Sequence, residues 1–370
     1  MTIPDACGRI ETNATNGGSR LVTIKEIAEK SGVSIGTVDR VLHERGRASE
    51  ATRQRVLAVA AELGYAPNRA AQGLAARKKK LHLGFAIVDP AGHPFFYKVL
   101  AAAEAKAASL AEYGVRVSFV RICVEHAENG EPRVRLTVPE DLSLEALDGI
   151  ALPGLNGAER DIALAPLTHL DIPTVYYNNP PGAPGGLAYV GCDYERAGEI
   201  AAGLCALCTG EKGRVVVCSE YAGDFEIAAY HGRMRGFEQR LRARYPNMRV
   251  TGSLVIQGDA EADLLAARRF LAAHPETDAA YVVNPGDYGI CRALRAADPS
   301  GRIRIVTNDL TEDVEALMRE GIVSATICQQ PEAQGERPLE LLFEYLAYGK
   351  APENPCWYTD LSVHIAENAD

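Results

Sequence analysis

The chain is constrained most by short apolar runs that alternate with longer stretches of helical periodicity, beginning at residue 81. Strand-like runs recur along this part of the sequence, among them LHLGFAIV, VRVSFVRICV, GIAL, PTVYY, RVVVC, AAYVV and RIRIV. Strands spaced by helices form parallel sheets that are covered on both faces. About 290 residues of this pattern predict an α/β body with two doubly wound parallel-sheet lobes.

The two expected lobes divide residues 81–370 between them. We predict that the first lobe takes about 81–210 and 331–350, and that the second takes about 211–330 and 351–370. Ligands of doubly wound folds bind beyond the carboxyl ends of the strands. The cleft between the lobes is therefore the expected ligand site.

Charge is distributed unevenly along the 370 residues. Residues 21–80 hold 12 Lys and Arg against 6 Asp and Glu, although the whole chain has a net charge of −10. A small basic segment on a large acidic body indicates that the segment meets a polyanion. We predict that residues 1–20 form a disordered extension. Since neither a secretory signal nor an apolar run of membrane length is found, we expect a cytoplasmic chain that contacts no membrane.

Residues 21–66 contain the start signals of short helices. Thr23 with Glu26 three residues later predicts a capping box, and Ser34 predicts a second N-cap. Gly32 can take the left-handed conformation that ends the first helix. Two short helices separated by a glycine turn make a helix-turn-helix. The basic charge favours a DNA-binding role over three ordinary helices of a larger core.

The stretch VTIKEIAEKSGVSIGTVDRVL, followed by GYAPNRAAQGLAARKKK, resembles the lactose/galactose repressor family of bacterial transcription factors. The resemblance implies an all-α helix-turn-helix headpiece, a hinge helix and an effector-binding and dimerisation body like a type I periplasmic binding protein. An arginine such as Arg40 suits a bidentate contact with guanine, and hydroxyl side chains suit phosphates. The DNA-binding residues that it implies in the headpiece are Thr23, Ser34, Ile35, Gly36, Thr37 and Arg40.

Asp39 departs from the family pattern, because most members have serine there. An acid in the groove repels phosphate, so Asp39 either braces Arg40 or accepts a hydrogen bond from a cytosine amine. We favour bracing, since an arginine–carboxylate hydrogen bond is charge-assisted.

Residues 67–80 follow the third predicted helix and begin with Pro67, which prevents helix continuation. A helix this short with an internal glycine does not hold alone, so we expect it to fold with its dimer partner and DNA. The resemblance implies that Asn68, Ala71 and Leu74 lie at the DNA, with Leu74 as an apolar wedge in the minor groove. A plain interdomain linker is the alternative, and it explains the basic charges but not the leucine.

Polar and aromatic side chains follow the predicted strands of the body. This mixture suits a neutral polyhydroxylated ligand, because rings stack on its C–H faces while bidentate groups bind its hydroxyls. HPFF and TNDLTEDVEALMREGIVSATICQQP also resemble the ribose-binding type of periplasmic receptor. The candidate ligand-binding residues are His93, Phe95, Phe96, Asn178, Asn179, Arg233, Asn284, Asp309 and Gln329.

By this second resemblance, Phe95 and Phe96 stack on the ligand, and Asp309, Gln329 and Arg233 bind its polar groups. Two adjacent asparagines at positions 178 and 179 replace an acid–arginine pair that is common in ribose receptors. Ribose itself is therefore not the expected ligand.

The chain has nine cysteines, scattered along its length. Cys205 and Cys208 form a CxxC pair at the end of an alanine-rich stretch, with no second ligand pair nearby in the sequence. We therefore predict no metal site and no cofactor. No Gly-x-Ser-x-Gly, phosphate-binding loop or His-Glu-x-x-His motif occurs, so we predict no enzyme.

These patterns predict a homodimeric transcription regulator, expected to be a repressor, that binds a near-palindromic double-stranded operator. A small effector, a sugar or a sugar derivative, is expected to control its DNA affinity. A sugar-binding solute receptor is the alternative: the body fits that function and the headpiece does not. An enzyme that acts on the ligand is the third hypothesis.

Overall fold

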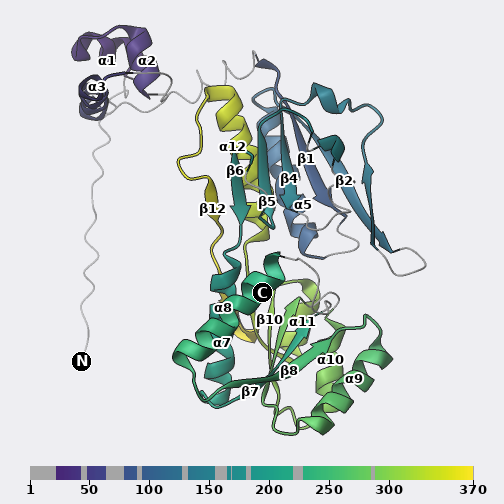
Figure 1. Cartoon of the computed structure of the whole chain (residues 1–370). Coiled ribbons are helices and arrows are strands. Elements are labelled where there is room, and N and C mark those ends of the chain that lie inside the picture. Colours follow the sequence, from purple (N-terminus) through teal and green to yellow (C-terminus); the bar gives the residue numbers. More distant parts are fainter. Residues whose placement is uncertain are drawn as a thin grey trace, which may run out of the picture. The chain divides into compact units, whose positions relative to one another are not determined.

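The structure is a computed structural model that describes residues 22–42, 48–63, 79–89, 94–126, 132–154, 165–167, 169–180, 185–219, 228–284 and 288–369. The chain divides into two compact units after Gln72. We call residues 22–63 the headpiece and residues 79–369 the body. Figure 1 shows that the headpiece is purely helical and that the body consists of two α/β lobes.

Three short helices form the headpiece: α1 (Ile24–Ser31), α2 (Ile35–Leu42) and α3 (Glu50–Glu62). The predicted capping box is confirmed, because Glu26 N donates to Thr23 Oγ1 at 3.3 Å and Thr23 N donates to Glu26 Oε2 at 2.8 Å. Gly32 ends α1 with a φ of 67°. Ile27 and Val38 are fully buried between the helices. Helices this short depend on such a shared core for their stability.

The first lobe is built on a seven-stranded sheet. Its strands are β1 (His82–Val88), β2 (Arg116–His126), β3 (Pro132–Thr137), β4 (Gly149–Gly154), β5 (Thr174–Asn178), β6 (Ala188–Gly191) and β12 (Cys356–Tyr358). The order across the sheet is β12-β6-β5-β4-β1-β2-β3, and all neighbours are parallel except β2 and β3. The helices α5 (Phe95–Ala111) and α12 (Pro331–Tyr348) pack against each other and bury Phe85, Val99 and Leu339 on this sheet.

The second lobe is built on a six-stranded sheet of order β13-β11-β10-β9-β7-β8. Its strands are β7 (Arg214–Ser219), β8 (Arg249–Val255), β9 (Ala279–Asn284), β10 (Arg304–Asn308), β11 (Val323–Cys328) and β13 (Ser362–His364), of which only β13 pairs antiparallel. One core cluster lies under α7 (Tyr194–Thr209) and α8 (Ala228–Arg244). Another lies under α9 (Ala260–Ala273), α10 (Gly289–Ala297) and α11 (Glu312–Arg319).

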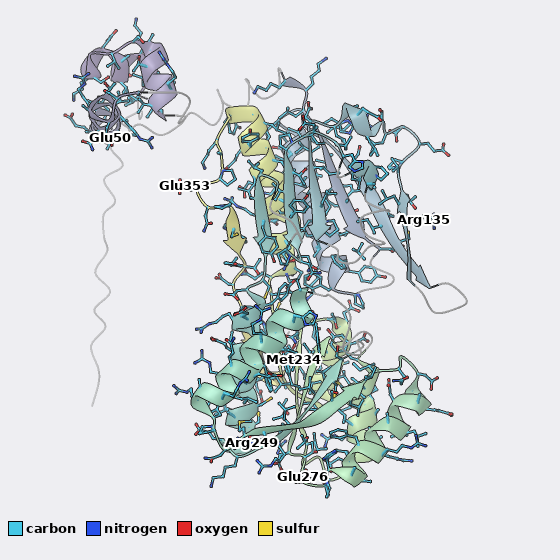
Figure 2. The ribbon with its side chains drawn as sticks, viewed as in Figure 1. Glu50, Arg135, Met234, Arg249, Glu276 and Glu353 are labelled. Atoms are coloured by element: carbon cyan, nitrogen blue, oxygen red, sulfur yellow. The ribbon has the colours of Figure 1, made fainter. Side chains whose placement is uncertain are left out.

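Both lobes are therefore mainly parallel sheets with helices packed on them, and the predicted fold class is confirmed. Figure 2 shows side chains filling the space between each sheet and its helices. Within the described residues, no helix is long and apolar enough to cross a membrane.

The strand β3 was not predicted. It pairs antiparallel with β2, from Arg121 opposite Thr137 to His126 opposite Pro132. In the sequence PRVRLT, apolar and polar residues alternate, which is the period of a strand with one covered face. Leu136 packs against the core cluster on that face.

Two predicted lobe boundaries were wrong. The strand β12 pairs with β6 in the first sheet, although residues 351–370 were expected in the second lobe. The helix α7 packs on the second lobe, although its residues were expected in the first. The cause is close helix packing, because a Cβ added at Gly198 of α7 would collide with the Arg233 carbonyl of α8, and one added at Gly236 would collide with the Glu195 carbonyl.

Candidate functional site

The described DNA-contact candidates lie in α2 and at the N-terminal ends of α1 and α2. Ser34, Ile35, Gly36 and Arg40 are exposed, and 53% of the Ile35 surface is open to solvent. Ser34 caps α2, since its Oγ accepts a hydrogen bond from Thr37 N at 3.1 Å. Arg40 Nε donates to the Gly36 carbonyl at 2.9 Å, which holds this side chain along its own helix. The structure therefore brings the exposed candidates together on α2, while Thr23 serves as the cap of α1.

Several predicted positions lie outside the described residues. These are Asn68, Ala71, Leu74 and His93, together with the side chains of Asp39 and Asn284. The backbone of Asn284 ends β9, as the sequence indicated. The hinge wedge and the role of Asp39 stay predictions.

A continuous chain of buried hydrogen bonds joins the two lobes. Asn178 Nδ2 donates to Gln334 Oε1 at 3.2 Å, Gln334 Nε2 donates to the Gln329 carbonyl at 3.0 Å, and Gln329 Nε2 donates to Asp309 Oδ1 at 2.8 Å. Asn178 ends β5 in the first lobe, and Asp309 follows β10 in the second. All four residues are at most 9% exposed. The structure thus brings three predicted ligand residues into one network through Gln334.

The backbone is unusual at this network. Asn178, Asp309 and Gln330 have φ values of 65°, 67° and 50°, and they are three of the six described non-glycine residues with positive φ. The Asn178 carbonyl accepts hydrogen bonds from the hydroxyls of Tyr189 at 2.6 Å and Tyr194 at 3.0 Å. Sparsely populated backbone conformations persist where the surroundings hold them, and they gather at functional sites.

Asn179 adds an acceptor beside this network. Its Nδ2 donates to Asn178 Oδ1 at 3.3 Å. Its own Oδ1 is buried and finds no hydrogen-bond partner within the described part of the chain. A buried acceptor without a partner costs about 1–3 kcal/mol. A ligand hydroxyl at this position would remove that cost.

Arg233 supplies the cation of the site. It lies in α8, is 4% exposed and donates from a terminal nitrogen to the Val283 carbonyl at 3.0 Å. Its Cζ is 5.2 Å from the centre of the Tyr194 ring. Burial by itself lowers the pKa of the guanidinium, but the nearby Asp309 carboxylate raises it, and the pKa lies above its ordinary value. A carboxylate and a guanidinium therefore share this buried region.

Phe95 and Phe96 lie at the start of α5 and are buried in the first-lobe core, with 4% and 5% of their surfaces exposed. Their ring centres are 5.3 Å apart in an edge-to-face arrangement. Both rings are thus packed inside the lobe that carries Asn178. That they stack on a ligand stays a prediction.

Comparison with known families decides what kind of protein this is. Residues 23–68 match the bacterial regulatory proteins of the lacI family, and residues 85–351 match the periplasmic binding protein domain. The chain belongs to the lacI family of bacterial regulatory proteins. Its body is a periplasmic binding protein domain, as the sequence predicted.

This lacI-family regulator has relatives along most of its length. It is 28% identical over 340 residues to the HTH-type transcriptional regulator CelR of Thermobifida fusca, a match that covers 89% of this chain and 90% of CelR. It is 40% identical over 84 residues to the ribose operon repressor of Bacillus subtilis, covering 23% and 25% of the two chains. The sugar-binding protein of a sugar ABC transporter from Bacillus halodurans has the same fold, with a TM-score of 0.64 at 21% identity over 78% of this chain and 99% of that one.

Sequence reasoning missed two residues of the regulator's interlobe network. A weak sequence signal existed for Gln334. Pro331 predicts a helix start, and the fourth residue of such a helix lies on the same face as its first turn. Tyr194 had none. It follows the N-cap Asp193 of α7, and only the fold brings its hydroxyl to the Asn178 carbonyl.

The two cysteines of the CxxC pair, Cys205 and Cys208, belong to no metal-ligand cluster within the described residues. Cys205 is fully buried, and burial raises the pKa of its thiol, whereas Cys208 is exposed. Across the ranges that the structure describes, no group of three or more His, Cys, Asp or Glu side chains is placed to hold a metal ion.

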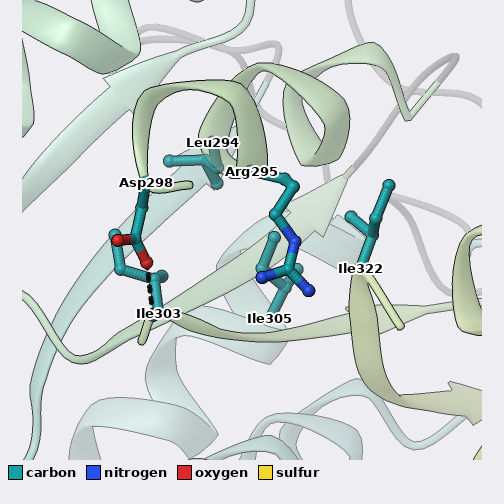
Figure 3. A pocket seen from close by; sticks show the side chains of 6 residues that line it. All are labelled: Leu294, Arg295, Asp298, Ile303, Ile305 and Ile322. Carbon is teal, nitrogen blue, oxygen red and sulfur yellow. Dashed lines mark hydrogen bonds between the residues drawn. The ribbon is translucent and has the colours of Figure 1, made fainter. Parts of the chain in front are cut away.

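A small pocket in the second lobe is also closed to ligands. Figure 3 shows the side chains of Arg295 and Asp298 beside the apolar side chains of Leu294, Ile303, Ile305 and Ile322. The accessible volume is about 0 Å³. Ile303 N donates to Asp298 Oδ2 at 2.8 Å, so the carboxylate stabilises the turn before β10.

Proposed function

We propose that this regulator is a homodimeric repressor of a near-palindromic operator, and that a small polyhydroxylated ligand held between its lobes sets its DNA affinity. The observation that carries the proposal is the buried hydrogen-bond chain from Asn178 to Asp309. Together with Arg233 and the unpartnered Asn179 Oδ1, it gathers amides, a carboxylate and a cation between the lobes. Such groups bind hydroxyls in pairs, so we expect a sugar or a sugar derivative.

Transmission to the DNA runs through the angle between the lobes. A ligand that contacts both lobes binds one angle better than others and shifts the population toward it. The helix α12 carries Gln334 near its start, and its Leu346 carbonyl accepts a hydrogen bond from Lys79 Nζ at 2.6 Å near its end. Movement of α12 therefore reaches Lys79, near the end of the predicted hinge segment 67–80. A coupling of about 1–3 kcal/mol is enough when the hinge helix is marginal.

The homodimer follows from the size of the headpiece. One helix-turn-helix reads about half of an operator, so twofold symmetry requires a near-palindromic site of roughly 14–20 base pairs. Analytical ultracentrifugation should show a dimer at micromolar concentration. A stable monomer would contradict this part of the proposal. We also propose that the regulator acts in the cytoplasm, because its DNA-binding headpiece is of the lacI type.

The experiment is operator selection followed by ligand titration. The full chain selects sites from a random DNA library, and the recovered operator is titrated in the presence of neutral pentoses, hexoses, disaccharides and sugar acids. We expect a near-palindromic operator whose affinity changes with at least one sugar. Selection of no sequence would contradict the regulator, and an operator indifferent to every sugar would contradict the ligand class.

A solute receptor is the second candidate, because the body has the fold of transporter sugar-binding proteins. The lacI-type headpiece favours the regulator. The two functions differ in one measurement, since a receptor binds sugar but selects no operator. The relatives are regulators and sugar-binding proteins, and we propose no catalytic step.

A further inference from the structure

A second cavity lies at the β12 edge of the first sheet, next to the network between Asn178 and Asp309 but lined by other residues. It has a volume of about 830 Å³. We call it the edge pocket. Its walls include Tyr189, Asp193, Glu195, Arg235, Cys356 and Tyr358.

Both lobes contribute to the edge pocket. Tyr189 and Tyr358 come from β6 and β12 of the first sheet, whereas Glu195 and Arg235 come from α7 and α8 of the second lobe. Figure 1 shows β12 and β6 side by side at the edge of their sheet. Because the two walls belong to different lobes, the width of the pocket depends on the angle between the lobes.

The pocket offers an aromatic face. Tyr358 lines the cavity, and 55% of its surface is exposed. Its ring centre is 6.3 Å from that of Tyr189, in an edge-to-face arrangement that fixes the orientation of both rings. A ring of a ligand can stack on the exposed face of Tyr358.

The pocket also offers hydrogen-bonding groups of both kinds. Arg235 donates to Glu195 Oε1 at 2.7 Å, so this cation is already paired. Asp193 adds a second carboxylate, which caps α7 by accepting from Arg196 N at 3.0 Å. His231 also lines the wall. With two carboxylates and one arginine that is already paired, these groups leave an excess of negative charge. That charge disfavours an anionic ligand such as a phosphate or a sugar acid.

We propose that the edge pocket is a second binding site, for a neutral sugar ring. An exposed aromatic face, carboxylate acceptors and an arginine donor together match the C–H faces and the paired hydroxyls of such a ring. The volume is within the range of small-molecule pockets. The inference does not depend on which ligand occupies the interlobe network.

Occupancy of the edge pocket is linked to that network through Tyr194. This residue lines the pocket, and its hydroxyl donates to the Asn178 carbonyl. A sugar in the pocket therefore acts on the same lobe angle that the interlobe ligand uses. A ligand can shift this equilibrium only by its different affinities for the two lobe angles.

Cys356 provides the test, because it is exposed and lines the pocket. The full chain is alkylated with iodoacetamide with and without D-arabinose, D-allose, D-galactose and D-tagatose, and each cysteine is followed by peptide mass spectrometry. A sugar at ten times its dissociation constant should slow alkylation of Cys356 about tenfold. Cys208 is the internal control, since it is exposed and lies about 20 Å from Glu195 along α7.

Variants separate the edge pocket from the interlobe network. Protection of Cys356 should persist in Asp309→Ala and should be lost in Tyr358→Ala. Tyr97→Ala is the matched control, because Tyr97 is 58% exposed on α5 and does not line the pocket. The pocket proposal is overturned if none of the four sugars protects Cys356, or if protection survives Tyr358→Ala but vanishes in Asp309→Ala. A failed operator response to sugar with intact Cys356 protection would instead overturn the proposed function.

Discussion

Asn178 and Gln334 lie 156 positions apart in the sequence and share a hydrogen bond of 3.2 Å that ties the last residue of β5 to the first turns of α12. Gln334 is fully buried and also donates to the Gln329 carbonyl at 3.0 Å. One glutamine therefore connects the first lobe to the segment that leaves the second. The relative position of the lobes depends on this side chain.

Replacing Gln334 with Met should destabilise the body and weaken ligand response. The change removes the partners of two buried polar groups, Asn178 Nδ2 and the Gln329 carbonyl, and each such group costs about 1–3 kcal/mol. Urea denaturation of the full chain measures the loss. Gln257→Met is the control, because Gln257 is exposed and its side-chain amide donates to the nearby Val255 carbonyl at 3.1 Å. Equal stability of the two variants would contradict the role of Gln334.

Asp309→Ala should abolish the response to the interlobe ligand and leave operator affinity near that of the unliganded protein. The carboxylate accepts from Gln329 Nε2 at 2.8 Å and lies close enough to raise the pKa of Arg233. Without it, a ligand loses its acceptor and meets a buried cation that lacks its counter-charge. Operator titration with and without sugar measures the effect. A variant that responds like the parent would show that the ligand binds elsewhere.

Local features of the fold were predictable from the sequence. The capping box at Thr23, the glycine that ends α1 and the alternation of strands with helices all depend on residues within a few positions of one another. Strand-end positions such as Asn178 and Asp309 were also found, because parallel strands place their carboxyl ends together. Local pattern, together with the family resemblance, thus predicted the architecture and three residues of the interlobe network, Asn178, Gln329 and Asp309.

Long-range features were not predictable. The hydrogen bond of Tyr194 to the Asn178 carbonyl, and the pairing of β12 with β6, join segments whose neighbourhood is set only by the folded sheet. The assignment of α7 to the second lobe depends on the fit of Gly198 and Gly236 against facing backbone, which apolar periodicity does not report. Only the three-dimensional structure shows these contacts.

The stability of the body should fall as pH rises above about 9, in part through Cys192. This thiol is 2% exposed, and burial raises its pKa from 9.0 to about 12. Above pH 9 the unfolded chain releases this proton while the folded chain keeps it. The free energy of unfolding therefore falls by up to about 1.4 kcal/mol per pH unit. The contribution is fully present below pH 9 and is lost as the pH approaches 12.

Urea midpoints compared at about pH 8 and about pH 10 measure this effect. Cys192→Ala should show a smaller decrease between the two pH values than the parent. Cys356→Ala is the control, because this cysteine is exposed. Identical pH dependence in the Cys192 variant and the parent would contradict the assignment.

Arg40→Ala should weaken operator binding by about 1–3 kcal/mol per half-site and relax the preference at one base pair. Arg40 is exposed on α2, and its described hydrogen bond runs from Nε to the Gly36 carbonyl of the same helix, so the headpiece should stay folded without it. Lys25→Ala is the control: its side chain is 73% exposed on α1 and pairs with Glu29 at 4.0 Å, and its loss should leave base preference unchanged. Binding of both variants to operators substituted one base pair at a time measures the difference. If Arg40→Ala keeps the parent's preference at every base pair, another residue of α2 reads the operator.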